Sequence, residues 1–243
     1  MALAHSPSIV TSGLVLCLDA GNTKSYNAGI STTAWTDLSG NTGISTLRNG
    51  ASYNSANGGF IDLDGVNDFV SVPTTSLYDF TSSRITIEVW LKINALPTNS
   101  YEVVTSDQSN DPTSWSLGFT KPTEGDVFVF MPSYLGSSVR NTSPRMATSS
   151  FPVNAWTHVV ATSAGNGDVG RMWVNGVKQI DGTSTTLGLS YDAGRDIGIG
   201  LEPTTFRYPL NGSIAVVRIY KDKAFVEAEV QQNFNALRGR FGI

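Results

Sequence analysis

Two neighbouring segments decide the fold: FIDLDGVNDFV at residues 60–70 and ITIEVWLKI at residues 85–93. In the second segment apolar side chains alternate with other side chains from Ile85 to Ile93. A period of two over this length is typical of a β-strand with one face on a core. In the first segment two short strands flank Asp64-Gly65, where glycine can adopt the positive φ of a tight turn. We therefore predict a hairpin at 60–70 and a long strand at 85–93, and the remaining strands add to this sheet.

The rest of the chain reads as short strands separated by turns. Strands are predicted at 13–19, 103–105, 115–119, 127–130, 156–162, 171–174, 177–180, 197–200 and 212–220. Asn175-Gly176 favours a two-residue hairpin. Residues 20–59 are predicted to form an ordered loop with short strands in it, anchored by Trp35 and Leu38. This succession predicts an all-β sandwich.

One helix is expected, near the C-terminus. Between Ala224 and Leu237 apolar side chains recur at steps of four, four and three residues. Glu227 and Glu229 lie in the first turns, where the helix dipole favours acidic side chains. Gly239 is predicted to end the helix.

Composition excludes several functional classes. The 243 residues carry a formal net charge of −4 without a basic stripe, so we expect no nucleic acid and no membrane insertion. No stretch approaches the roughly 18 apolar residues of a transmembrane helix, and no signal-peptide pattern opens the sequence. The single cysteine, Cys17, is predicted to be a buried apolar side chain. His158 lies in an apolar strand and is predicted to be a satisfied sheet histidine and not a general base.

Several segments follow one another in an order typical of one family. They are GFIDLDGVNDFV (59–70), ITIEVWLK (85–92), WTHVVAT (156–162), RMWVNG (171–176) and LNGSIAVVRIY (210–220). This ordered set resembles the laminin-G-like, concanavalin A-like jelly-roll family over residues 13–235. The resemblance implies a two-sheet antiparallel jelly-roll β-sandwich with one C-terminal helix. We accordingly divide the chain into an N-terminal arm (1–12), a laminin-G-like domain (13–237) and a C-terminal tail (238–243).

The two ends of the domain resemble a narrower group. The segments concerned are GLVLCLDAGNTKSY (13–26), WTDLSG (35–40) and QNFNALRGRF (232–241). They look like the laminin-G-like proteins of tailed bacteriophages, cyanophages among them, which are virion structural proteins. The resemblance implies an accessory or decoration subunit of the virion, made in the host cytoplasm, oligomeric in the particle and bound to capsid or tail subunits. The arm and the tail would then be docking segments, or else simply frayed ends.

Enzymatic activity is not expected, although glycoside hydrolases share the fold. They need two carboxylates that face each other, which on one strand means acids two residues apart. Glu124 and Asp126 have this spacing but sit at a turn, and no third acid follows. Asp62 and Asp64 have it too, but Asp64 begins a turn. Glu88 is the single acid on its strand, so we predict a protein that is not an enzyme.

Calcium is a candidate cofactor, because many relatives of this resemblance bind it through acidic loops at one rim. Asp64, Asn67 and Asp68 would supply three oxygen ligands within five residues. Asp107, with Asn110 and Asp111, would supply a second set. The competing explanation is that the first cluster only forms turns, through side-chain bonds to its own backbone.

Sugar binding would use exposed aromatic side chains. The candidates are Trp90, Trp115, Trp156, Trp173 and Tyr208. Tryptophans in a sandwich usually belong to the core, so the pair Arg207-Tyr208 is the preferred candidate for carbohydrate binding. The alternative to the virion subunit is therefore a carbohydrate-binding module, in a tail or fibre, that recognises host-surface glycans.

Overall fold

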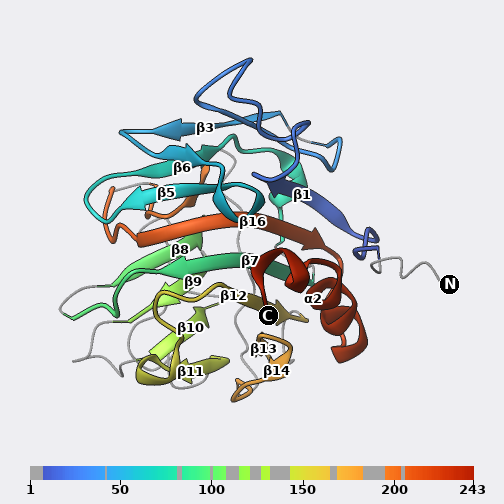
Figure 1. Ribbon diagram of the computed structural model, residues 1–243. Helices are drawn as coiled ribbons and strands as arrows, with labels where there is room; N and C mark the ends of the chain where they lie inside the picture. The colour runs from blue at the N-terminus through green and yellow to red at the C-terminus, as the bar shows by residue number, and fades with distance from the viewer. Residues whose placement is uncertain are drawn as a thin grey trace, which may run out of the picture.

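Two antiparallel β-sheets pack face to face, and one helix covers the outer face of one sheet (Figure 1). The computed structural model describes residues 8–41, 43–80, 84–98, 101–107, 115–120, 127–131, 143–164, 169–182, 195–203 and 206–243. The family of folds predicted from the sequence, a two-sheet sandwich with a C-terminal helix, is confirmed. No helix in these ranges is long and apolar enough to cross a membrane.

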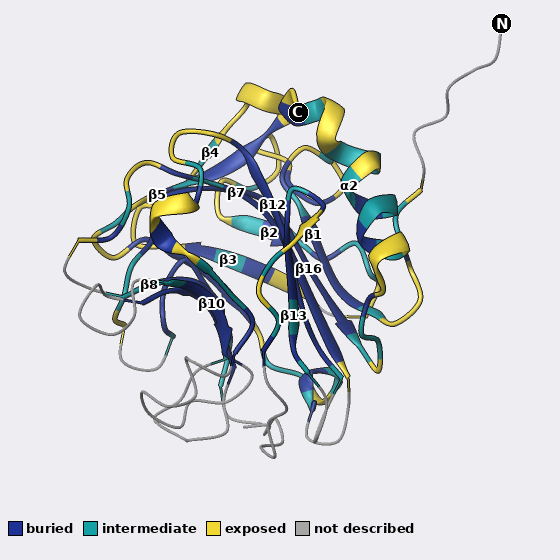
Figure 2. Cartoon of the chain, turned by 90° about the horizontal axis from the view of Figure 1, so that it is seen from below, coloured by how far each residue is buried: buried dark blue, intermediate teal, exposed yellow. Residues whose placement is uncertain are grey.

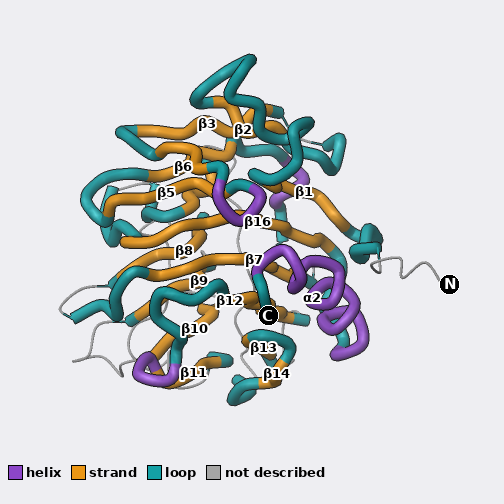
Figure 3. Tube along the Cα trace, in the orientation of Figure 1, coloured by secondary structure: helices purple, strands orange, loops and turns teal. Residues whose placement is uncertain are grey.

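Sheet A has the strand order β14-β13-β12-β7-β16-β5-β4, and β1 also pairs with β16. Its strands are β1 (Leu14–Asp19), β4 (Ser52–Asn54), β5 (Phe60–Asp64), β7 (Ile85–Ile93), β12 (Thr157–Ser163), β13 (Arg171–Val174), β14 (Val177–Lys178) and β16 (Asn211–Lys221). Helix α2 (Glu227–Phe241) lies against this sheet, beside β12 and β13 (Figure 3).

Sheet B has the order β11-β10-β9-β8-β15-β6-β3-β2. Its strands are β2 (Ala34–Thr36), β3 (Ile44–Arg48), β6 (Phe69–Val72), β8 (Glu102–Ser106), β9 (Ser116–Phe119), β10 (Val127–Met131), β11 (Arg145–Ala147) and β15 (Ile197–Ile199). Short 3₁₀ helices occupy Ala56–Gly58, Ser76–Tyr78 and Thr148–Ser150.

The main core fills the space between the sheets with aliphatic and aromatic side chains. Trp35 and Leu47 contribute to it from the segment 20–59, which contains short strands as predicted. Cys17 is buried and free, also as predicted. Burial raises the pKa of its thiol, and the neighbouring Arg218 guanidinium acts in the opposite direction.

The hairpin predicted at 60–70 is wrong. β5 pairs with β4 and β16 in sheet A, while β6 pairs with β3 and β15 in sheet B. The chain therefore crosses from one sheet to the other at this point. Gly65 does take a positive φ of 76°, and a Cβ there would come within 2.8 Å of the Cβ of Asn211. The alternating pattern identified two strands and a turn, but alternation does not specify a strand's partner.

β7 has core on both faces, and not on one face as the alternation predicts. Thr86, Glu88 and Trp90 lie outside the main core cluster, yet each is fully buried. In Figure 2 strand β7 is accordingly coloured as buried. Helix α2 supplies the second layer. Its residue Phe241 stacks on Trp90 with ring centroids 4.3 Å apart, in a cluster that also holds Phe60.

Helix α2 continues past the predicted stop at Gly239. It ends at Phe241, and Gly242 adopts the left-handed conformation with φ 75°. Arg240 donates from Nη1 to Oδ1 of Asp19 at 2.6 Å, so the segment assigned to a tail packs on the domain. At the other end of the chain, the backbone N–H of Val10 donates to Oδ1 of Asn233 on the helix. Ser8 and Val10 of the predicted arm therefore lie against the same helix, while residues 1–7 lie outside the described residues.

Candidate functional site

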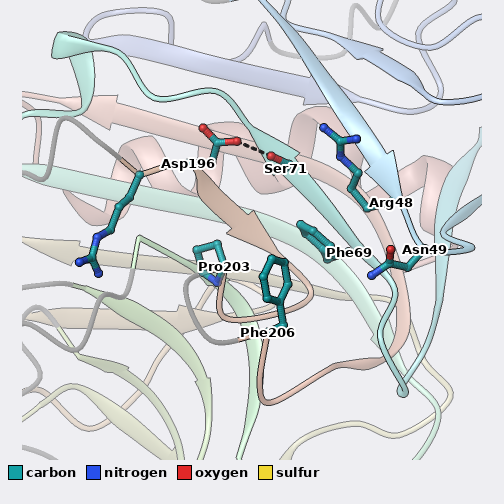
Figure 4. A pocket seen from close by; sticks show the side chains of 8 residues that line it. Arg48, Asn49, Phe69, Ser71, Asp196, Pro203 and Phe206 are labelled. Carbon is teal, nitrogen blue, oxygen red and sulfur yellow. Dashed lines mark hydrogen bonds between the residues drawn. The ribbon is translucent and has the colours of Figure 1, made fainter.

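A cavity of about 610 Å³ opens on the outer face of sheet B. It is lined by Arg48, Asn49, Phe69, Ser71, Arg195, Asp196, Pro203 and Phe206. Its size falls within the roughly 300–1,000 Å³ of small-molecule sites. Figure 4 shows the polar side chains Asp196, Ser71 and Arg48 along one side and Pro203 and Phe206 along the other.

The register of three strands fixes the floor of this cavity. Ser71 on β6 pairs with Thr46 on β3 and with Gly198 on β15. Its neighbours Val70 and Val72 belong to the core between the sheets. Because side chains alternate along a strand, Phe69 and Ser71 face outward together.

The segment after β15 folds back onto the outer face and forms one wall. A Cβ at Gly198 would come within 2.2 Å of the carbonyl oxygen of Leu201 and 2.9 Å of Pro203 Cδ, so glycine is required there. The backbone N–H of Glu202 donates to the carbonyl of Arg207 at 2.9 Å. This return brings Phe206 over β6.

Phe206 combines exposure with an unfavourable backbone conformation. Its side chain is 62% exposed, and its φ is +54°. Its ring meets Phe69 edge-on, with centroids 5.7 Å apart and planes at 65°. A bulky side chain in the left-handed region costs on the order of 1–3 kcal/mol, and such residues are often found at ligand sites. The result is an apolar ring held at the mouth of the cavity.

The opposite wall offers hydrogen-bonding groups. The Ser71 hydroxyl donates to Oδ2 of Asp196, and the Thr74 backbone N–H donates to Oδ1 of the same carboxylate at 3.2 Å. Asn49, at φ 62°, donates its amide N–H to the carbonyl of Asn67 at 3.0 Å. These bonds hold the Asp196 carboxylate and the Asn49 amide in place, and both keep acceptor capacity for ligand hydroxyl groups.

The predicted pair Arg207-Tyr208 is not part of this cavity. Arg207 is exposed, whereas Tyr208 is half-buried against Tyr101, with ring centroids 5.0 Å apart. Tyr208 lines a separate, narrower cleft together with Glu102. Burial raises the pKa of Glu102 to about 7.

The sequence did not identify the aromatic residues of the cavity. Phe206 directly precedes the predicted pair in the same polar loop. This position in a loop was the feature of the sequence that could have identified it as an exposed aromatic residue. Phe69 and Asp196 carried no signal, because only the pairing of β6 with β15 brings them together. The tryptophans proposed as alternatives are all buried: Trp90, Trp115, Trp156 and Trp173.

The predicted calcium ligands form a turn. Oδ1 of Asp64 accepts from the backbone N–H of Val66 at 2.8 Å and of Asn67 at 3.3 Å, which matches the turn explanation. These backbone N–H groups lower the pKa of Asp64, most of all that of Val66. Oδ2 of Asp68 accepts from the Asp64 N–H, while its Oδ1 is buried without a partner. Burial, and secondarily the charge of Asp64, raises the pKa of Asp68.

This donor set fits a calcium ion poorly. Within the described residues, no three His, Cys, Asp or Glu side chains are grouped closely enough to hold a metal. In the second predicted set, Oδ1 of Asp107 accepts from the backbone N–H of Trp115 at 2.7 Å. Asn110 and Asp111 lie outside the described residues.

Glu88 and His158 form a buried charge cluster beneath helix α2. Oε1 of Glu88 lies 2.7 Å from Nη1 of Arg218 and 3.1 Å from Nε2 of His158, and all three residues are buried. Its Oε2 accepts from Asn233 at 2.6 Å and from the Tyr220 hydroxyl at 3.2 Å. Asn233 connects this cluster to helix α2, so the cluster holds the helix on the sheet. His158 is a buried sheet residue, as predicted, but it is not fully satisfied, because its Nδ1 has no partner among the described residues.

Burial and partners act in opposite directions on this cluster. Burial by itself would raise the pKa of Glu88, but the Arg218 guanidinium and His158 outweigh it and lower the pKa to about 2. Burial, together with the Glu88 charge, raises the pKa of Tyr220.

The other predicted acid pairs give no catalytic arrangement that the structure describes. Asp62 accepts from the Ser213 hydroxyl at 2.7 Å and from the Asn54 amide at 3.2 Å. Glu124 and Asp126 lie outside the described residues.

Comparisons with known proteins match this architecture. A family model described as the concanavalin A-like lectin/glucanases superfamily matches residues 64–231. No curated protein sequence matches the chain. Domain 4 of a GH43 extracellular arabinanase from Geobacillus stearothermophilus, in complex with arabinotriose, is 20% identical with a TM-score of 0.63. That similarity covers 93% of this chain and 98% of the domain.

Two further structures are similar to parts of larger chains. Trypanosoma rangeli sialidase is 18% identical with a TM-score of 0.65, covering 94% of this chain and 34% of the sialidase. The binding domain of Paraclostridial Mosquitocidal Protein 1 is 18% identical with a TM-score of 0.63, covering 92% of this chain and 52% of that one. This chain thus spans about a third of the sialidase and about half of the mosquitocidal binding domain. At such identities the similarity concerns the fold.

Proposed function

Because the chain belongs to the concanavalin A-like lectin/glucanases superfamily, we propose that it is a non-catalytic carbohydrate-binding domain. Its site is the cavity on the outer face of sheet B. The observation that carries the proposal is Phe206, an exposed ring in a left-handed conformation, edge-on to Phe69 and opposite a polar wall.

The two walls match the two chemical faces of a sugar. The apolar C–H face of a pyranose or furanose ring would pack on Phe206, and its hydroxyl groups would donate to Asp196. The arabinanase domain that shares the fold holds arabinotriose, which supports the same class of ligand here.

The test is glycan binding by the purified chain, first on an array of host-surface and plant polysaccharides and then by calorimetry on the best ligand. F206A is expected to weaken binding at least tenfold, because the apolar wall is lost. Y208A is the matched control, since Tyr208 is an aromatic of the same loop that lines a different cleft. Equal loss in both variants, or retained binding in F206A, would contradict the assignment.

A virion role is the second candidate. Val177 and Ile180 are 64% and 59% exposed beside β14, at the end of the sheet A strand order. Such side chains would suit a contact with another virion subunit, and this surface is distinct from the cavity. Stoichiometric presence of the protein on purified particles, located by cryo-EM, tests this role. If the protein is absent from particles but binds glycans, the virion role is rejected and the carbohydrate-binding function is retained.

Calcium at Asp64, Asn67 and Asp68 remains a prediction. It is supported by Oδ1 of Asp68, which has no partner among the described residues, and by the cavity that Asp64 and Asp68 line together. Calorimetric titration of the chelator-treated protein with calcium chloride tests it. Heat that disappears in D68N would support the site, and no heat would leave the turn explanation.

A further inference from the structure

We propose that the cavity selects a sugar that carries an anionic group, which Arg48 binds. The inference rests on the carbohydrate-binding function proposed above. It specifies that the ligand is negatively charged and that Arg48 is the residue that recognises this charge.

Arg48 is held at the edge of the cavity by the sheet. It is the last residue of β3 and pairs directly with Phe69 on β6. Its side chain extends along the polar wall beside Ser71 (Figure 4). The backbone of Arg48 is thus fixed by strand pairing, and its guanidinium stands opposite the aromatic wall.

The charge of this guanidinium is not neutralised by the described part of the protein. Arg48 is exposed and makes no ion pair or hydrogen bond through its side chain with the described residues. The carboxylate among the lining residues is that of Asp196, and it is engaged by the Ser71 hydroxyl and the Thr74 N–H. Arg48 therefore brings to the cavity a positive charge without an ion-pair partner among the described residues, on a chain whose net charge is −4.

A guanidinium is suited to an anionic sugar group. Its planar N–H donors match two oxygens of one carboxylate or sulfate at once, and such charge-assisted bonds are stronger than bonds to neutral hydroxyls. With the ring of the sugar on Phe206, a ring substituent could reach the opposite wall. Hexuronic acids and sulfated hexoses share this chemistry.

The experiment compares charged saccharides with their neutral counterparts. The first pair is an oligogalacturonate and its methyl ester, and the second is a sulfated galactan oligosaccharide and its desulfated form. Wild-type protein is expected to bind at least one anionic form about tenfold more tightly than its neutral counterpart. That preference should decrease when the salt concentration rises from 50 to 300 mM. The pair that shows it identifies the anion as carboxylate or sulfate.

R48Q tests the residue. It should lose most of the anionic preference and keep its affinity for the neutral form, while R48K should keep part of the preference. R207Q is the matched control, because Arg207 is also exposed but does not line the cavity. Since Arg48 and Arg207 are exposed, R48Q, R48K and R207Q are all expected to melt within about 1 °C of wild type.

Three outcomes would overturn the inference. Equal binding of charged and neutral forms by wild type, with loss of both in F206A, would remove the anion and keep the carbohydrate function. An equal effect of R48Q and R207Q would show a general charge effect and no specific site. Binding of neither form of either pair would contradict the inference and, on a full glycan array, the proposed function with it.

Discussion

Both sheets carry a carboxylate and an arginine on their outer faces, but helix α2 covers only one of these pairs. On sheet A, Glu88 and Arg218 lie fully beneath the helix and bind each other at 2.7 Å. On sheet B, Asp196 and Arg48 line an open cavity and form no ion pair with each other. Similar chemical groups therefore act in two ways. Where the face is covered they fix the packing of a helix, and where it is open they line a cavity.

The difference comes from what the chain places over each face. Sheet A receives Val230, Phe234 and Phe241 from the helix, which seal its aromatic residues from water. On sheet B, the short segment that follows β15 folds over the outer face, and it leaves Phe206 62% exposed to solvent. The covered face should therefore govern stability, and the open face should govern binding.

The largest effect is expected at the buried carboxylate. E88A leaves the Arg218 charge without its partner in an environment that water does not reach, which typically costs about 3–5 kcal/mol. Urea denaturation followed by fluorescence measures the change in the free energy of unfolding. A loss below about 1 kcal/mol would show that water enters the cluster.

The same carboxylate predicts an acid dependence. The pKa of Glu88 in the folded protein, about 2, lies below the unfolded value of about 4.3. Its ionised form therefore stabilises the fold above the unfolded pKa, and this contribution is lost as the pH falls from about 4.5 toward 2. E88Q should lack this component in a pH series of melting curves. An unchanged pH profile in E88Q would assign the acid dependence to other carboxylates.

The third prediction concerns the end of the helix. F241A removes a ring that is 6% exposed and stacked on Trp90, so a loss of about 3 kcal/mol is expected. I243A is the matched control, because Ile243 is 42% exposed and should change stability by less than about 0.5 kcal/mol. Equal effects would mean that the C-terminus is a frayed end, which was the alternative to a docking segment in the sequence analysis.

The sequence predicts which segments form strands and which form the helix better than it predicts the contacts between the sheets and the helix. Alternation from Ile85 to Ile93 identifies β7, but its second buried face depends on a helix that starts at Glu227. Glu88 looks isolated along the chain because its partners Arg218 and Asn233 follow far later in sequence. Helix length was misjudged at Gly239 because the anchoring residue, Phe241, packs through tertiary contacts that periodicity does not show.

The cavity was less predictable for a similar reason. Its residues come from β3, from β6 and from the segments on either side of β15, and no local sequence pattern shows that these strands are neighbours in the sheet. The pair Arg207-Tyr208 was the nearest prediction, one residue away from Phe206. Both Phe206 and Tyr208 have a left-handed φ, of 54° and 64°, yet the first side chain is exposed and the second is half-buried. Which aromatic side chain of this loop is exposed therefore depends on tertiary contacts that the sequence pattern does not show.

A smaller effect on stability is expected at Glu102, in the narrow cleft beside Tyr208. Its folded pKa of about 7 lies above the unfolded value, so the fold is stabilised below about pH 4.5 and this contribution is lost as the pH rises through 7. E102Q should therefore be more stable than wild type at pH 8, by about 1–2 kcal/mol after allowance for solvent screening. At pH 4 the two proteins should melt alike. A variant that is destabilised at both pH values would show that the carboxylate makes a specific contact.

The smallest change in stability, with the largest change in binding, is expected at Phe206. F206G relieves the positive φ that a bulky residue tolerates poorly, and it removes only an exposed ring. Its free energy of unfolding should rise by up to about 1 kcal/mol, while F206A, which keeps the strain, should not gain. Both variants should lose glycan binding in the same calorimetric titration. If F206G instead loses as much stability as F241A, the ring supports the fold, and the outer face of sheet B is then a second structural layer without a ligand.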